Sequence, residues 1–141
     1  MVFIFGEISE IKDFAIIVFS CLTVFTLWIF FRLRSGADLK PSLDGKPNEF
    51  TWTTIFISLW YFSGMVLDGW AHTHGVVDES FFTKWHALFY SGFMAFAGFT
   101  IWTLWRLHDG KLPTNLSSLT DFFKGMPQGY GAATAGMLIF G

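Results

Sequence analysis

Charge is scarce in this chain of 141 residues: Lys, Arg, Asp and Glu together make up 14% of it, and the formal net charge is −2. Without a basic excess, nucleic acid is not expected as a partner, because contacts to phosphates require clustered Lys and Arg. Cysteine is scarcer still, and the single Cys21 excludes an internal disulfide. The sequence therefore lacks the features of a nucleic-acid-binding or disulfide-stabilised protein.

Apolar and aromatic residues are abundant instead. The chain is 52% hydrophobic and 21% aromatic, with 19 Phe and 7 Trp. A water-soluble domain of this size keeps much of its surface exposed and has little interior in which to cover so many large rings. In a membrane, lipid covers large apolar rings, so their number is not unfavourable. The composition predicts an integral membrane protein, with the lipid bilayer as a partner.

Long apolar runs separated by polar loops predict three membrane-spanning helices, at about residues 12–33, 50–72 and 84–107. Each run is close to the ~20 residues that cross a bilayer. A fourth run, residues 129–141, is only 13 residues long and is expected to be the start of a fourth helix. The predicted fold is an all-α integral membrane helix bundle that forms a single domain over residues 1–141, with the chain an N-terminal fragment of a longer protein.

Local signals refine the ends and contacts of these helices. Thr83 precedes the third apolar run and is a predicted N-cap. Ser91, Ala95 and Gly98 recur at helical spacing, so we expect a neighbouring helix to approach that face closely, as small residues allow in membranes. Gly69 is a second candidate for close approach. Residues 118–121 resemble a weak capping box, which predicts a short helical turn on the membrane surface.

The distribution of Lys and Arg predicts the orientation. Loop 32–49 contains four of these residues and loop 106–128 contains three, whereas the N-terminal tail and loop 73–84 contain one each. Basic loops face the cytoplasm. We therefore expect a multi-pass protein of the cell membrane with its N-terminus outside, and with loop 73–84 on the extracytoplasmic side.

A carboxylate and two imidazoles flank that outer loop. Asp68 and His72 are four residues apart, which places them on one face of a helix, and His86 opens the next apolar run. Asp68 has no Lys or Arg within a helical turn in the sequence. Two imidazoles and a carboxylate suit copper, zinc or iron(II). We predict a metal site with Asp68, His72 and His86 as ligands.

Two questions stay open at this point. Three ligands leave a position for water, substrate or a fourth residue, and Glu79 and His74 are the candidates for a fourth ligand. The alternative to a metal site is a set of interfacial polar residues, with Asp68 in hydrogen bonds and the histidines hydrated. Trp70 and Trp85 either belong to an interfacial aromatic belt or screen the site from water.

Around these residues the sequence resembles the C subunit of the copper-dependent membrane monooxygenases, the ammonia and particulate methane enzymes. Segments 67–72 and 82–86 match the Asp-x3-His and Phe-Thr-Pro-x-His elements of that family, but Lys84 replaces the Pro. Thirteen residues lie between the two histidines, one more than in the family. The chain also resembles a family of microbial polytopic membrane proteins of unassigned function that repeat a related motif in a second half.

The resemblance implies that Asp68, His72 and His86 bind copper, with zinc and iron as alternatives. It also implies a membrane monooxygenase subunit that activates dioxygen toward a small apolar substrate from lipid, although catalysis itself is not predicted from the residues. The alternative is a membrane scaffold or metal-delivery protein with a structural or transient metal site. Expected partners are other membrane subunits or a further half of the same protein.

Overall fold

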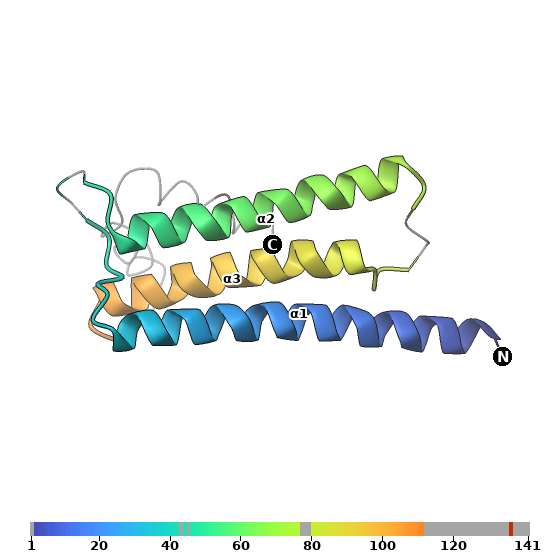
Figure 1. The fold of residues 1–141 in the computed structure, drawn as a ribbon, viewed down its shortest axis with the longest axis horizontal. Coiled ribbons are helices and arrows are strands. Elements are labelled where there is room, and N and C mark those ends of the chain that lie inside the picture. The colour runs from blue at the N-terminus through green and yellow to red at the C-terminus, as the bar shows by residue number, and fades with distance from the viewer. Residues whose placement is uncertain (1, 43, 45, 77–79, 112–135, 137–141) are drawn as a thin grey trace.

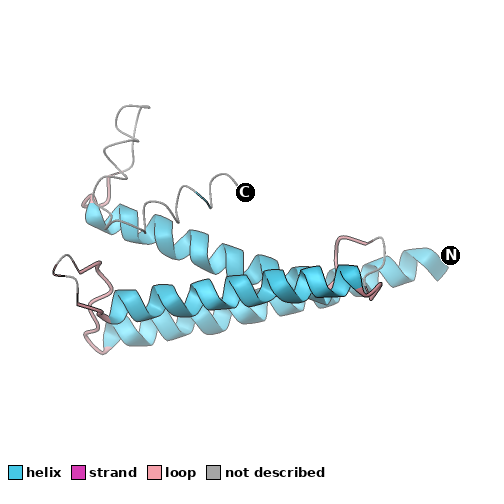
Figure 2. Ribbon diagram, turned by 90° about the horizontal axis from the view of Figure 1, so that it is seen from above, coloured by secondary structure: helices cyan, strands magenta, loops and turns pink. Residues whose placement is uncertain are grey.

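The structure is a computed structural model that describes residues 2–42, 44, 46–76, 80–111 and 136. These residues form three long α-helices and their connections, with no strand among them (Figure 2). The all-α membrane fold predicted from the sequence is therefore confirmed. The expected start of a fourth helix at residues 129–141, the capping box at 118–121 and Glu79 lie outside the described residues.

The helices run from Val2 to Arg34 (α1), from Glu49 to Thr73 (α2) and from Lys84 to Leu107 (α3). The bounds of α2 and α3 agree with the prediction to within a residue. α1 begins about ten residues earlier than expected, because no proline precedes Pro41 and the charged residues before position 14 are compatible with a helix. Its C-terminus is a Schellman motif in which Gly36 adopts a φ of 84° and Ala37 donates its N–H to the Arg32 carbonyl.

The central helix of the bundle is α3, which lies between α1 and α2 (Figure 1). Half of its most apolar window is buried, against 22% for α2 and 6% for α1. Consecutive helices run in opposite directions. The N-terminus of α1 therefore lies at the same end of the bundle as the connection between α2 and α3 (Figure 1). Most of the α1 surface is therefore left uncovered by the other described helices.

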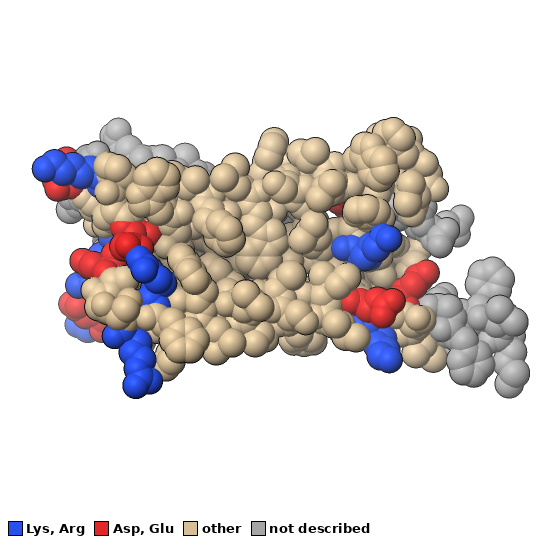
Figure 3. Space-filling view, in the orientation of Figure 1, with Lys and Arg blue, Asp and Glu red and all other residues tan. Residues whose placement is uncertain are grey.

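All three helices are long and apolar enough to cross a membrane. In Figure 3 the charged side chains gather at the two ends of the molecule, and the band between them is largely free of charge. Such a band is the surface expected where lipid hydrocarbon surrounds a protein. α1 has 33 residues and is about 50 Å long at 1.5 Å per residue, so it extends beyond a hydrocarbon core of about 30 Å.

Large and small side chains are segregated along the interface of α2 and α3. The buried large residues lie toward the start of α2, where the Phe50 and Phe99 rings stack 5.5 Å apart and Ile57 is fully buried. Toward the other end the buried side chains are small, with Ala71 and Ala87 both at 0% exposure. Small buried side chains therefore line the interface in the half of α2 that carries Asp68 and His72.

Two glycines set the closest approach. A Cβ added at Gly64 would lie 2.7 Å from Phe89 Cα, and one at Gly92 would lie 2.8 Å from Tyr61 Cα. The helices thus cross with backbone against backbone, a geometry that small residues permit in membranes. The prediction named other residues: Ser91 and Ala95 are buried as expected, but Gly98 and Gly69 face open space. Which face of a helix meets its neighbour depends on packing, and helical spacing alone does not define it.

The Arg32 guanidinium forms an ion pair with the Glu49 carboxylate, which joins the end of α1 to the start of α2. Because both side chains are about 40% exposed (39% and 42%), we expect a double-mutant cycle of Arg32→Gln and Glu49→Gln to give a coupling energy below about 1 kcal/mol. Reversible unfolding in detergent measures it. A coupling above about 2 kcal/mol would mean that this pair, rather than helix packing, anchors α1.

Candidate metal centre

The C-terminal end of α2 and the first turn of α3 bring together the three predicted ligands. Asp68 and His72 lie one turn apart on α2, and His86 is the third residue of α3. α2 ends in a Schellman motif, since Gly75 has a φ of 64° and Val76 donates its N–H to the Ala71 carbonyl. The chain therefore turns directly after His72 and returns to α3 with His86 close to its starting point.

The ligand atoms converge on one point. The two Nε2 atoms of His72 and His86 are 3.3 Å apart, His86 Nε2 is 3.4 Å from Asp68 Oδ1, and His72 Nε2 is 3.8 Å from Asp68 Oδ2. With one ligand atom from each residue, all three lie within 4.8 Å of one another. A tetrahedral ion with bonds of about 2.0–2.2 Å separates its ligands by about 3.3–3.6 Å. The His72–His86 and His86–Asp68 Oδ1 distances match this spacing, and the 3.8 Å from His72 Nε2 to the other carboxylate oxygen, Oδ2, is slightly longer.

The burial of the three side chains differs. Asp68 and His86 are only 16% and 15% exposed, whereas His72 is 52% exposed. Asp68 Oδ1 is fully buried and accepts no hydrogen bond from any described residue, although His86 Nε2 lies 3.4 Å away. A buried carboxylate oxygen without a donor is costly. A cation between Asp68 and the imidazoles would satisfy it, so the residues present fit a metal ion.

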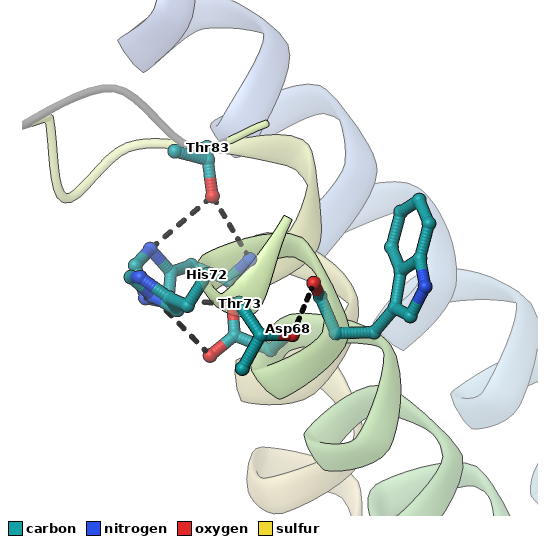
Figure 4. A network of polar contacts seen from close by, with 6 residues as sticks. Asp68, His72, Thr73 and Thr83 are labelled. Carbon is teal, nitrogen blue, oxygen red and sulfur yellow. Dashed lines mark hydrogen bonds and ion pairs between the residues drawn. The ribbon is translucent and has the colours of Figure 1, made fainter. Parts of the chain in front are cut away.

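Residues around His86 hold its ring in place. Thr83 caps α3: its Oγ1 accepts the His86 backbone N–H at 3.1 Å and also lies 3.2 Å from His86 Nδ1. Figure 4 shows Thr83 above Asp68 and His72 in one polar network. The Phe81 ring stacks on the imidazole of His86 with centroids 5.3 Å apart, and Phe14 of α1 contacts Phe81 in turn. His86 is thus the most constrained of the three ligands.

The two candidate fourth ligands have different outcomes. Glu79 lies outside the described residues. His74 is the C-cap of α2, and its ring stacks on Trp70 with centroids 4.6 Å apart and Nδ1 2.9 Å from the Trp70 carbonyl oxygen. It does not belong to the group that converges with Asp68. The helix ends near Gly75, as a fourth ligand at residue 74 would require, yet the ring turns toward Trp70.

The aromatic residues near the site lie at its side. Trp70 is 47% exposed and meets Trp85 edge to face with centroids 6.0 Å apart. The Trp70 ring stacks on His74, whereas the Phe81 ring stacks on the imidazole of His86. Screening of the ligands therefore comes from Phe81, which the sequence did not single out. The sequence signal for Phe81 is an aromatic residue a few positions before a ligand that lies in the first turn of a helix.

An apolar hollow of about 630 Å³ lies elsewhere, between α1 and α2. Its walls include Phe25 and Trp28 of α1 and Trp52 and Trp60 of α2. These residues of α2 belong to its first half, whereas Asp68 and His72 are in its last two turns. The hollow is therefore not part of the metal centre.

The fold and the site define a class: a membrane protein with spanning helices and a candidate cluster of Asp68, His72 and His86 for metal binding. Comparison of the chain with models of protein families, with curated proteins and with solved structures finds no match.

Proposed function

We propose that this chain is a copper-binding integral membrane protein that holds its ion with Asp68, His72 and His86 near the outer membrane face. The single observation that carries the proposal is the convergence of two ring nitrogens and the Asp68 carboxylate at 3.3–3.8 Å, in which Oδ1 is buried without a hydrogen-bond donor among the described residues. Two Nε2 atoms that face each other at 3.3 Å are well placed to donate their lone pairs to a common ion.

The donor set favours a transition metal. Magnesium and calcium prefer shells made of oxygen, whereas imidazole suits zinc, copper, iron and nickel. Copper is preferred here because of the resemblance of segments 67–72 and 82–86 to the monooxygenase C subunits. Zinc and iron remain the alternatives that the same ligands accept.

The exposure of His72 supports a site with an open coordination position. Structural metal sites are closed by four protein ligands, whereas catalytic sites keep a position for water or substrate. Among the described residues three ligands converge, and the 52% exposure of His72 leaves that side accessible. In a monooxygenase-type subunit, bound copper would supply the redox chemistry that activates dioxygen toward a small apolar substrate. The chain's own residues would orient the ion and shield it through Asp68 and Phe81.

The same exposure favours a second candidate function. A site that opens to water on the His72 side can exchange its ion with another protein, as a metal-delivery protein or a membrane scaffold with a transient site requires. In either function α1, the least buried of the spanning helices, offers the surface for other membrane subunits or for a further half of the protein.

We place the site on the extracytoplasmic side. The N-terminus of α1 and the α2–α3 connection lie at one end of the bundle (Figure 1), and Arg32, Arg34 and Arg106 lie near the helix termini at the other. With the basic end in the cytoplasm, the N-terminus and the metal centre face outward.

Metal analysis of the purified protein tests the proposal. The wild type is expected to bind about one copper ion per chain, and His72→Ala and His86→Ala are expected to lose it, because each removes a ligand. His74→Ala is the matched control and should retain the ion, since its ring lies on Trp70. Equal metal in all four proteins would exclude the site. Tight zinc binding without copper would favour the scaffold, and copper-dependent oxygen uptake would favour the enzyme.

A further inference from the structure

We infer that Thr83 is a positioning residue that holds the His86 ring in the tautomer and orientation in which Nε2 faces the ion. This inference rests on the proposed metal site and adds to it a residue that binds no metal itself. It assigns to Thr83 a second task beside the capping of α3.

The contacts of Thr83 Oγ1 carry the inference. The oxygen accepts the backbone N–H of His86 at 3.1 Å, and His86 Nδ1 lies 3.2 Å away (Figure 4). A hydroxyl oxygen has two lone pairs, so it can accept both hydrogen bonds at once. One atom thereby holds both the backbone and the ring of the same residue, which restricts how the imidazole can rotate.

The chemistry of a neutral imidazole fixes what this contact does. When Nε2 binds a metal through its lone pair, the ring proton must be on Nδ1, and Nδ1 then acts as a donor. Thr83 Oγ1 is at the position that receives that proton. Outer partners of this kind orient metal-bound histidines, and their loss typically lowers metal affinity 10–100-fold.

Phe81 completes the arrangement on the face of the ring. It stacks on His86 with an interplanar angle of 18°, so it limits tilting while Thr83 limits rotation in the plane. His72 is 52% exposed and has more freedom. His86 is therefore the preorganised ligand, and His72 is the one that adjusts to the ion.

The simpler explanation is that Thr83 acts only as an N-cap. Three variants separate the two roles. Thr83→Ser keeps the hydroxyl, Thr83→Val keeps the shape without the acceptor, and Thr83→Gly removes the hydroxyl while Gly still serves nearly as well as Thr at an N-cap. Asn48→Gly is the matched control, because Asn48 caps α2 through Thr51 N–H at the opposite end of the bundle.

The experiment titrates the purified full chain in detergent with Cu²⁺ and, separately, with Zn²⁺, and records the circular dichroism of each variant to check its helix content. We expect Thr83→Val and Thr83→Gly to bind either ion at least about tenfold more weakly than the wild type. Thr83→Ser and Asn48→Gly should bind like the wild type. Pulsed electron paramagnetic resonance of the copper form detects the remote imidazole nitrogen, which does not bind the ion. Its signal should change in Thr83→Gly and stay unchanged in Asn48→Gly.

Each other result has one meaning. Wild-type affinity in Thr83→Val and Thr83→Gly overturns the positioning role and leaves the metal site intact. A failure of Thr83→Ser to bind, or an equal loss in Asn48→Gly, overturns it too, because the effect would then follow bulk or helix stability. No metal in the wild type overturns the proposed site and this assignment with it.

Discussion

Replacing Asp68 with Asn is expected to remove the stabilisation that a bound ion provides, while the ion-free protein stays at least as stable as the wild type. Asn keeps the shape of the side chain but removes the charge, and a neutral amide is a much weaker ligand for copper or zinc than a carboxylate. In the ion-free protein, the buried Asp68 Oδ1 has no donor among the described residues, so removing its charge relieves a cost.

The magnitude follows from mass action. An ion at one hundred times its dissociation constant stabilises the folded state by about 2.7 kcal/mol, and a hundredfold loss of affinity at the same concentration leaves only about 0.4 kcal/mol. Losing a direct ligand should cost at least as much affinity as losing an outer partner, for which 10–100-fold is typical. Thermal unfolding in detergent, with and without Zn²⁺ or Cu²⁺, measures both quantities.

The control for this prediction is His74→Ala, which changes a histidine two residues from His72 but outside the converging group. It should keep the full ion-dependent rise in melting temperature. A rise of normal size in Asp68→Asn would show that the carboxylate is not a ligand. A large loss of stability in ion-free Asp68→Asn would instead assign Asp68 a structural role in hydrogen bonding.

Replacing Gly64 with Ala is expected to force α2 and α3 apart and to weaken the metal site as a consequence. The added Cβ would lie 2.7 Å from Phe89 Cα and 3.0 Å from Phe89 N, and both are backbone atoms that cannot move alone. Overpacking of this kind costs about 1–3 kcal/mol, which exceeds the gain of up to about 1 kcal/mol when Ala replaces Gly in a helix. Gly92→Ala should have a similar effect through Tyr61.

Gly69→Ala is the matched control, since Gly69 lies on the same helix, next to Asp68, and has no atom within 4 Å of an added Cβ. It should be neutral or slightly stabilising. Unfolding in mixed detergent measures the stability of the helix pair, and metal titration of the same samples measures the site. If Gly64→Ala behaves like Gly69→Ala in both assays, the close crossing of α2 and α3 does not position the ligands.

Much of the fold follows from local features of the sequence. Apolar runs of about 20 residues and their polar ends define α2 and α3, because a helix in lipid must satisfy its backbone internally along its whole length. Thr83 is an N-cap as predicted, since its hydroxyl needs only the backbone two or three residues ahead. The start of α1 was missed, because charged residues beyond the bilayer continue a helix without adding an apolar signal.

Part of the candidate site was also predictable, because it depends only on local helix geometry. Asp68 and His72 share a face at a spacing of four residues, which holds in any α-helix. Glu79 stays a prediction. His74 also stays a prediction, and its ring lies outside the converging group, because its direction depends on its contact with Trp70 and on the conformation of the chain at Gly75. Neither can be derived from the spacing of the histidines.

By itself, the sequence determined that this protein has membrane-spanning helices and that an acid and two histidines flank one of its short connections. Only the tertiary structure decided that their ligand atoms converge, because this depends on how α2 and α3 are rotated about their axes and how closely they approach. Gly64 and Gly92 set that approach, and Phe81 and Thr83 set the angle of the His86 ring. These are contacts between elements, and the periodicity of a single helix carries no information about them.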